Sequence, residues 1–153
     1  MKIKKIIIGI MLLTLTACGY QPIYSSKNTS NISINKIKLE GDKNINRKII
    51  LLANIKSNNI ASSYDLILKT KKNTLITAKD KSGNPSIYSS SLDVQLILKD
   101  TSNSEKIFKT KNFNSSFSYK NIENKFDLQR YQKTIEENLI DNIVEEISIF
   151  LNS

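Results

Sequence analysis

The sequence predicts an α+β fold, a two-layer sandwich in which two helices cover one face of a four-stranded sheet. Apolar and polar residues alternate in four separate stretches, as in strands that bury one face. A spacing of three or four residues, which is typical of helices, separates the first two stretches and returns at the end of the chain. The expected order is therefore β-α-β-β-β-α, in a mixed or mostly antiparallel sheet.

Residues 32–42 are predicted to contain the first strand. Four aliphatic residues here are interleaved with polar ones: Ile32, Ile34, Ile37 and Leu39. The alternation breaks once, at Asn35 and Lys36, which indicates a β-bulge. Gly41 and Asp42 form a turn signal that ends the strand.

The next apolar residues are spaced as on the inner face of a helix of about three turns. They are Ile45, Ile49, Leu52 and Ala53. Asn44 and Asn46 are the two candidates for its N-cap. If the strands before and after this helix share one sheet, the helix is a right-handed crossover and the two strands are parallel.

A long hairpin is predicted between residues 64 and 98. The residues expected on its buried face all have even numbers: Tyr64, Leu66, Leu68, Thr70, Ile76 and Ala78 in the first arm, Tyr88, Leu92, Val94, Leu96 and Leu98 in the second. The connection from Asp80 to Pro85 is rich in turn residues. A turn centred on Ser82 predicts that Leu68 faces Leu96 and that Leu66 faces Leu98, so each even position meets another.

A fourth strand is predicted over residues 106–119, after a turn at residues 101–104. Phe108 falls on one parity, whereas Phe113, Phe117 and Tyr119 fall on the other. We therefore expect a bulge or a twisted edge within this strand.

The last segment is predicted to be a helix of about 24 residues, long enough to cover the length of a sheet. Its apolar residues recur every three or four positions: Leu128, Tyr131, Ile135, Leu139, Ile143, Ile147 and Phe150 or Leu151. Asp127 and Asn124 are the candidate N-caps. The acidic residues fall mostly off the apolar line, which favours a core-covering helix over a coiled coil.

The start of the chain has the features of an export signal. Three lysines precede an apolar run of ten residues, Ile6 to Leu15, which is too short to span a bilayer. The run ends in Leu15-Thr16-Ala17-Cys18, which resembles the lipobox of bacterial lipoproteins at all four positions. We expect cleavage between Ala17 and Cys18, and lipidation of the Cys18 thiol.

These features divide the chain into three parts. Residues 1–17 are the predicted signal peptide, residues 18–31 a lipidated cysteine with a polar tether, and residues 32–153 a single α+β domain. Gly19 follows the cysteine where aspartate would signal retention in the inner membrane. By the sorting rule of Gram-negative lipoproteins, this resemblance implies the periplasmic face of the outer membrane.

The charged side chains are unevenly placed. The net charge is +9, and removal of Lys2, Lys4 and Lys5 leaves +6. Residues 19–120 carry 17 basic and 7 acidic side chains, whereas residues 121–153 carry 3 basic and 7 acidic ones. A basic surface suits an anionic partner such as a phosphorylated glycolipid, and a solvated lysine-rich surface is an equally good explanation of charge alone.

The composition argues against catalysis. The chain has no histidine, and Cys18 is its only cysteine, so it has no Ser/His or Cys/His pair, no imidazole for zinc and no internal disulfide. We expect no enzyme activity, no metal and no cofactor. Nucleic acid is disfavoured as a class of partner because the protein is exported and its lysines are not arranged around stacking aromatics.

The residues after the lipobox carry a family resemblance. Gly19-Tyr20-Gln21-Pro22-Ile23-Tyr24, together with Phe117-Ser118-Tyr119 ahead of Tyr131, resembles the LPS-assembly lipoprotein family LptE in its alphaproteobacterial form. Gln132 and Glu137 stand where that family usually has alanine. The resemblance implies two helices on one face of a four-stranded sheet. It also implies a domain that sits inside the outer-membrane β-barrel LptD, which inserts lipopolysaccharide into the outer leaflet.

Lys79 and Lys81 are our candidates for contact with lipopolysaccharide, because the tip of a long hairpin projects furthest from the packed layers. The alternative function is that of an accessory lipoprotein of another envelope machine, for β-barrel assembly or phospholipid transport. Such a protein would share the anchor and the size, and the co-purifying barrel would distinguish the two.

Overall fold

The computed structural model describes residues 32–58, 63–103 and 106–152. Its elements are β1 (Ile34–Gly41), α2 (Lys43–Leu52), β2 (Tyr64–Lys79), β3 (Pro85–Asp100), β4 (Ile107–Lys120) and α3 (Lys125–Asn152). The strands form one sheet in the order β1-β2-β3-β4. β1 is parallel to β2, and the other two pairs are antiparallel. The predicted α+β order is confirmed, and the sheet is mixed.

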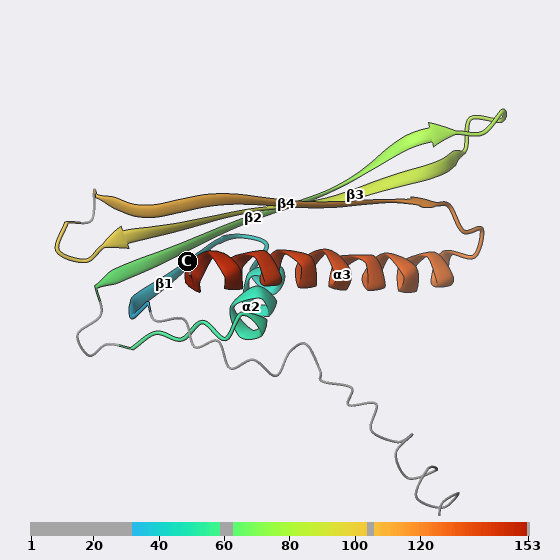
Figure 1. Ribbon diagram of the computed structural model, residues 1–153. Helices are drawn as coiled ribbons and strands as arrows, with labels where there is room; N and C mark the ends of the chain where they lie inside the picture. Colours follow the sequence, from blue (N-terminus) through green and yellow to red (C-terminus); the bar gives the residue numbers. More distant parts are fainter. Residues whose placement is uncertain (1–31, 59–62, 104–105, 153) are drawn as a thin grey trace, which may run out of the picture.

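Both helices lie on the same face of the sheet (Figure 1). α3 runs along β3 and β4, and α2 packs beside it against β1 and β2. The β2–β3 hairpin continues past the start of α3, so its outer end has no helix beneath it. None of the described elements covers the opposite face of the sheet.

The hydrophobic core fills the space between the sheet and the two helices. Its largest fully buried side chains are Ile34, Ile45, Ile49, Leu66, Leu68, Leu92, Val94, Leu96, Leu98, Ile140, Ile143 and Ile147. Each side chain of this size contributes about 1.5–3 kcal/mol when it leaves water. The core therefore stabilises the half of the hairpin that lies over the helices.

The predicted hairpin register is confirmed for the two leucine pairs, since Leu66 pairs with Leu98 and Leu68 with Leu96. The rule that even positions meet even positions fails near the tip. There the register shifts and Ala78 pairs with Ile87. Ile76 is also 49% exposed rather than buried, because β1 pairs with β2 only as far as Thr70 and leaves this part of β2 at the edge of the sheet.

The two predicted irregularities are present. In β1, the pairing with β2 shifts between Ile34 and Ile37, as the broken alternation indicated. In β4, the shift lies next to Phe108, because Leu98 pairs with Lys109 but Lys99 pairs with Ile107.

The parity of β4 does not fully predict its burial. Phe113 and Tyr119 are buried as expected, whereas Phe117 is about half exposed. β4 is an edge strand, so one side of Phe117 has no neighbouring strand to cover it.

The predicted cap of α2 was wrong. Asp42 is the N-cap, and its Oδ1 accepts hydrogen bonds from the backbone amides of Asn44 (2.9 Å) and Ile45 (3.1 Å). Asn46 is instead fully buried, and its amide donates to the carbonyl of Glu40 at 2.9 Å. Leu52, expected on the inner face, is 51% exposed. The buried residues of this helix are Ile45, Asn46 and Ile49.

Gly41 is required at the junction of β1 and α2. Its φ is +88°, in the left-handed region that favours glycine. A Cβ at this position would lie 1.9 Å from the carbonyl oxygen of Thr70. The junction thus requires a residue without a side chain. Its absence lets the chain pass close to β2, so that α2 begins close under the sheet.

α3 is 28 residues long, and Asn124 is the cap at its start. The side chain of Asn124 accepts hydrogen bonds from the amides of Phe126 (2.9 Å) and Asp127 (3.4 Å). Glu136, in the middle of the helix, joins three elements through Lys48 of α2 (3.4 Å) and Lys72 of β2 (2.5 Å).

Candidate functional site

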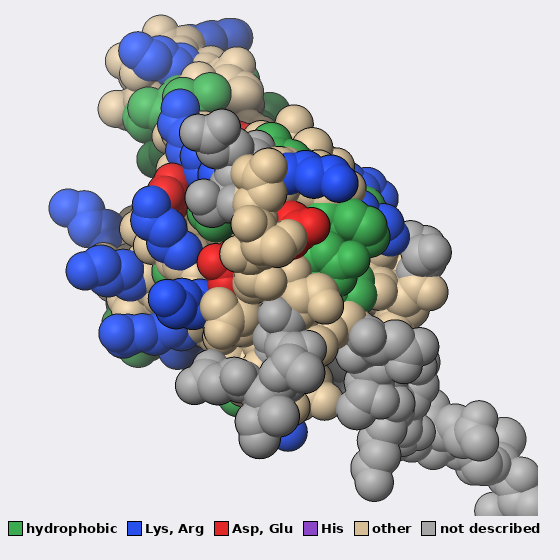
Figure 2. Space-filling model, turned by 90° about the vertical axis from the view of Figure 1, so that its left-hand side faces the viewer, with side chains coloured by type: hydrophobic (Ala, Val, Ile, Leu, Met, Phe, Trp, Pro, Cys, Tyr) green, Lys and Arg blue, Asp and Glu red, His purple; other side chains and the backbone are tan. Residues whose placement is uncertain are grey.

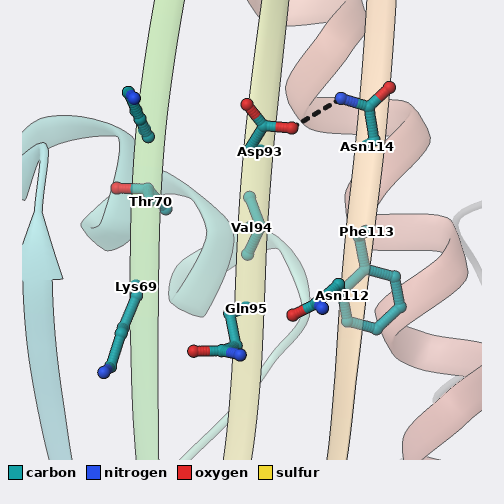
Figure 3. A pocket seen from close by; sticks show the side chains of 9 residues that line it. Lys69, Thr70, Asp93, Val94, Gln95, Asn112, Phe113 and Asn114 are labelled. Carbon is teal, nitrogen blue, oxygen red and sulfur yellow. Dashed lines mark hydrogen bonds between the residues drawn. The ribbon is translucent and has the colours of Figure 1, made fainter.

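The uncovered face of the sheet carries a polar surface. It is formed by the odd-numbered residues of β2 and β3 and by their partners in β4. At its centre lies a shallow hollow of about 370 Å³ (Figure 3). The charged and amide side chains that line it are Lys69, Lys71, Asp93, Gln95, Asn112 and Asn114. We call these six residues the polar array.

The strand register arranges the polar array in two rows (Figure 3). Lys69, Gln95 and Asn112 form one row across β2, β3 and β4. Lys71, Asp93 and Asn114 form the other, and there the amide of Asn114 donates to Oδ1 of Asp93 at 2.6 Å. Since opposite positions in a sheet point to the same face, each row presents one cation beside hydrogen-bonding groups.

Glu40 of β1 limits the charge of this surface at its edge. Its carboxylate pairs with Lys38 at 2.9 Å and with Lys69 at 3.4 Å. The hydrogen bond from Lys38 is the main reason that the pKa of Glu40 lies below its usual value. Glu40 is therefore ionised at neutral pH and forms ion pairs with both lysines.

The polar array offers lysine ammonium groups and amides, which bind anions and hydroxyl groups. The described residues contain no cluster of three or more acidic or cysteine side chains that would hold a metal ion. Its chemistry is that of a polar contact surface.

The hairpin tip holds the two lysines singled out by the sequence. Lys79 is the last residue of β2 and Lys81 lies in the turn, and both are exposed. The turn is ordered by Asp80, whose Oδ1 accepts from the amides of Ser82 (2.8 Å) and Asn84 (2.9 Å). The bond from Asn84 is the main reason that the pKa of Asp80 is lowered. The structure places both lysines at the projecting tip, and their contact with lipopolysaccharide stays a prediction.

The exposure of apolar side chains near the tip was not predicted from the sequence. Leu75 is 65% exposed, and Ile76 and Ile87 are also exposed. Leu75 and Ile87 have odd numbers, so they lie on the same uncovered face as the polar array. The signal that would have identified them is an aliphatic residue out of phase in a strand that otherwise buries even positions.

Lysine and arginine side chains are the most prominent charged groups at one end of the molecule. Figure 2 views the end at which β3 ends and β4 begins, and basic side chains gather along one side of it. Few acidic side chains lie among them in this view. Basic side chains therefore outnumber acidic ones on the face seen in Figure 2.

The predicted lipidation site lies outside the described residues. Cys18 and Ala17, the signal peptide over residues 1–17 and the tether over residues 18–31 all precede residue 32, the first described residue. Among the helices of the described segments, none is long and apolar enough to cross a membrane.

Solved structures of bacterial lipoproteins share this fold. Lipoprotein B from Nitrosomonas europaea superposes with a TM-score of 0.59 at 10% identity, covering 76% of this chain and 80% of that one. A Caulobacter crescentus protein described as a lipoprotein gives 0.56 at 16% identity, covering 82% and 92%. Rare lipoprotein B from Shewanella oneidensis gives 0.50 at 15%, covering 76% and 96%. No protein-family model and no curated protein matches the sequence. The comparisons therefore establish the fold.

Proposed function

We propose that this protein is an outer-membrane lipoprotein of the LptE type. In this proposal, it assembles with an LptD-type β-barrel and plugs it while lipopolysaccharide is inserted into the outer leaflet. The carrying observation is a fold shared with bacterial lipoproteins in a chain whose residues Leu15 to Cys18 match a lipobox. The residues from Gly19 to Tyr24 add the resemblance to LptE.

The shape of the domain supports a role inside a larger partner. It is a two-layer domain with a hairpin that extends past its helices (Figure 1). Its uncovered face is polar along the centre and carries exposed aliphatic residues toward the tip. Surfaces that bind other proteins also combine an apolar patch with hydrogen-bonding groups.

The hairpin tip supports contact with a phosphorylated glycolipid. Lys79 and Lys81 flank Asp80, whose ionised carboxylate accepts hydrogen bonds from the backbone of the turn. The two lysines outnumber this single carboxylate at the tip, and ammonium groups bind phosphates as point charges. Changing both lysines to glutamate is expected to weaken binding of the purified protein to lipopolysaccharide.

A matched control for this double variant is the change of Lys125 and Lys133, two exposed lysines of α3, to glutamate. It alters charge by the same amount on α3 instead of the hairpin tip. Equal loss of binding in both double variants would indicate a general charge effect. Unchanged binding after substitution of Lys79 and Lys81 would remove the tip from the proposal.

Co-purification tests the assembly directly. The protein, tagged after Ser153, is purified from outer membranes in mild detergent, and its partners are identified by mass spectrometry. A single large LptD-like barrel in near-equal amount is expected. A different barrel machine in its place would instead identify the protein as an accessory lipoprotein for β-barrel assembly or phospholipid transport, and would contradict the LptE proposal.

A further inference from the structure

The outer side of α2 exposes two consecutive leucines. Leu51 is 78% exposed and Leu52 is 51% exposed, although the same helix buries Ile45 and Ile49 in the core. Single exposed leucines are common, but here two are consecutive, and Leu51 lines a hollow of about 240 Å³. The residues around it are Leu39, Arg47, Ile50, Leu51, Asn54, Ile55 and Lys56. The surface is therefore an apolar depression with two cations at its rim.

The segment that carries this depression is basic, and the two charged residues that line the depression, Arg47 and Lys56, are both cations. Residues 32–58 contain six basic side chains, namely Lys36, Lys38, Lys43, Arg47, Lys48 and Lys56, and two acidic ones. Lys38 pairs with Glu40 and Lys48 pairs with Glu136, so these two ammonium groups are already engaged, and Asp42 caps α2. Within the described segments, no carboxylate forms an ion pair with Arg47 or Lys56.

We infer that this α2 surface lies against a membrane that contains anionic phospholipids. The inference rests on the lipid anchor of the proposed function, but it concerns a different side of the molecule. Exposed leucines flanked by lysine and arginine are the composition of helices that lie in the membrane interface. Each basic side chain near an anionic surface favours contact by a factor of about five.

The tether makes a membrane the fitting partner. Residues 19–31 separate the predicted anchor at Cys18 from the start of the described domain. A chain of this length extends at most roughly 45–50 Å, so the anchor keeps the domain near the bilayer. β1 and α2 are the first elements after the tether. Contact between α2 and the bilayer is thus an intramolecular event with a high effective concentration.

This contact would orient the domain without using the candidate functional site. α2 lies on the helix side of the sheet, whereas the polar array lies on the opposite face (Figures 1 and 3). The hairpin tip projects away at the far end of the sheet. Membrane contact through α2 leaves both free for a barrel partner.

Tryptophan fluorescence can test the contact because the chain contains no tryptophan. The full lipidated protein is prepared as Leu51→Trp and, as the matched control, Leu75→Trp, which replaces another exposed leucine at the far end of the hairpin. Both are inserted in vesicles of phosphatidylcholine with phosphatidylglycerol, with or without brominated phospholipid. Circular dichroism checks that both variants keep the fold.

We expect the emission of L51W to shift to shorter wavelength and to be quenched by brominated lipid, and that of L75W to remain unquenched. Adding Arg47→Glu and Lys56→Glu to L51W should lower the contact equilibrium about 25-fold, since each cation contributes about fivefold. The charge-preserving pair Arg47→Lys and Lys56→Arg should retain the quenching. Quenching should also fall in vesicles of phosphatidylcholine alone.

Equal quenching of L51W and L75W would overturn the inference. So would a blue-shifted L51W that brominated lipid does not quench, because the leucines would then be covered by protein, either another segment of the chain or a second copy. If the protein did not float with the vesicles, both the predicted lipid anchor and the contact of α2 with the membrane would be refuted. Loss of barrel co-purification while L51W remains quenched would refute only the assembly with LptD.

Discussion

The two ends of the β2–β3 hairpin share one pattern of residues but lie in opposite environments. Over the helices, Leu66 and Leu98 are fully buried. Beyond Thr70, where the pairing of β1 with β2 ends, Ile76 continues the same even-numbered series, yet it is 49% exposed. Alternation therefore specifies the strand, whereas burial depends on which neighbouring elements cover it. The covered end holds the fold together, and the uncovered end is available to a partner.

The largest expected difference between the two ends concerns core truncation. Leu98→Ala should lower the free energy of unfolding by about 2–5 kcal/mol, because it leaves a cavity in a closed core. Ile76→Ala, at the uncovered end, should cost less than about 1 kcal/mol. Urea unfolding followed by circular dichroism measures both. Similar losses would show that the outer hairpin is part of the core, and the distinction between the two ends would not hold.

Two glycines with nearly equal backbone angles provide the second comparison. Gly41 has φ +88° and no room for a Cβ, whereas Gly83, at the hairpin tip, has φ +86° and open space around it. Gly41→Ala should cost about 3 kcal/mol or more, because strain and a steric clash with Thr70 act together. Gly83→Ala should cost only about 1 kcal/mol from the backbone angle. Thermal unfolding of the two variants would contradict this if the order were reversed.

A third prediction concerns the boundary between the ends, where Tyr119 joins the sheet to α3. Its hydroxyl is 3.3 Å from Oγ of Ser90 and accepts a hydrogen bond from Gln132 at 3.0 Å. Tyr119→Phe should cost about 1–2 kcal/mol, because the partners are left partly unpaired. Tyr131→Phe is the control, since that ring packs edge-on against Tyr119 but is partly exposed. Chemical denaturation should show a smaller loss for the control.

The smallest expected effect is the pH dependence due to Glu136. Burial opposes its ionisation, but hydrogen bonds and charges from Lys72 and Lys48 outweigh burial and lower its pKa below the usual 4.5. A lowered folded-state pKa gives stability that is present above pH 4.5 and is lost as pH falls through the folded value. The contribution should be below about 1 kcal/mol, since the lysines are partly exposed. In Glu136→Gln, urea midpoints between pH 6 and pH 3 should fall less steeply than in the wild type.

Local patterns predicted the fold but not the cap of α2. Alternation and a turn at Ser82 were enough for the pairs Leu66–Leu98 and Leu68–Leu96, because hairpin register depends on nearby residues. Asp42 was missed as the cap, since it was assigned to the preceding turn and Asn44 and Asn46 offered the same chemistry. Which one caps depends on how α2 packs under Thr70 and Glu40.

The candidate site was predicted only at its tip. Lys79 and Lys81 follow from the hairpin alone. The polar array depends on the side-by-side placement of β2, β3 and β4, which brings together residues far apart in the sequence such as Lys71 and Asn114. The exposure of Leu51 and Leu52 likewise depends on which side of α2 meets α3, and the spacing of apolar residues placed Leu52 on the wrong side.

Site-specific photo-crosslinking in cells tests most directly whether the uncovered end of the hairpin meets the partner. A photoreactive residue replaces Leu75 on the uncovered face near the tip and, as a control, Glu145 on the exposed side of α3. We predict that position 75 forms a covalent adduct with a large outer-membrane barrel and that position 145 forms less of it. A barrel adduct from position 145 with none from position 75 would contradict this placement of the partner.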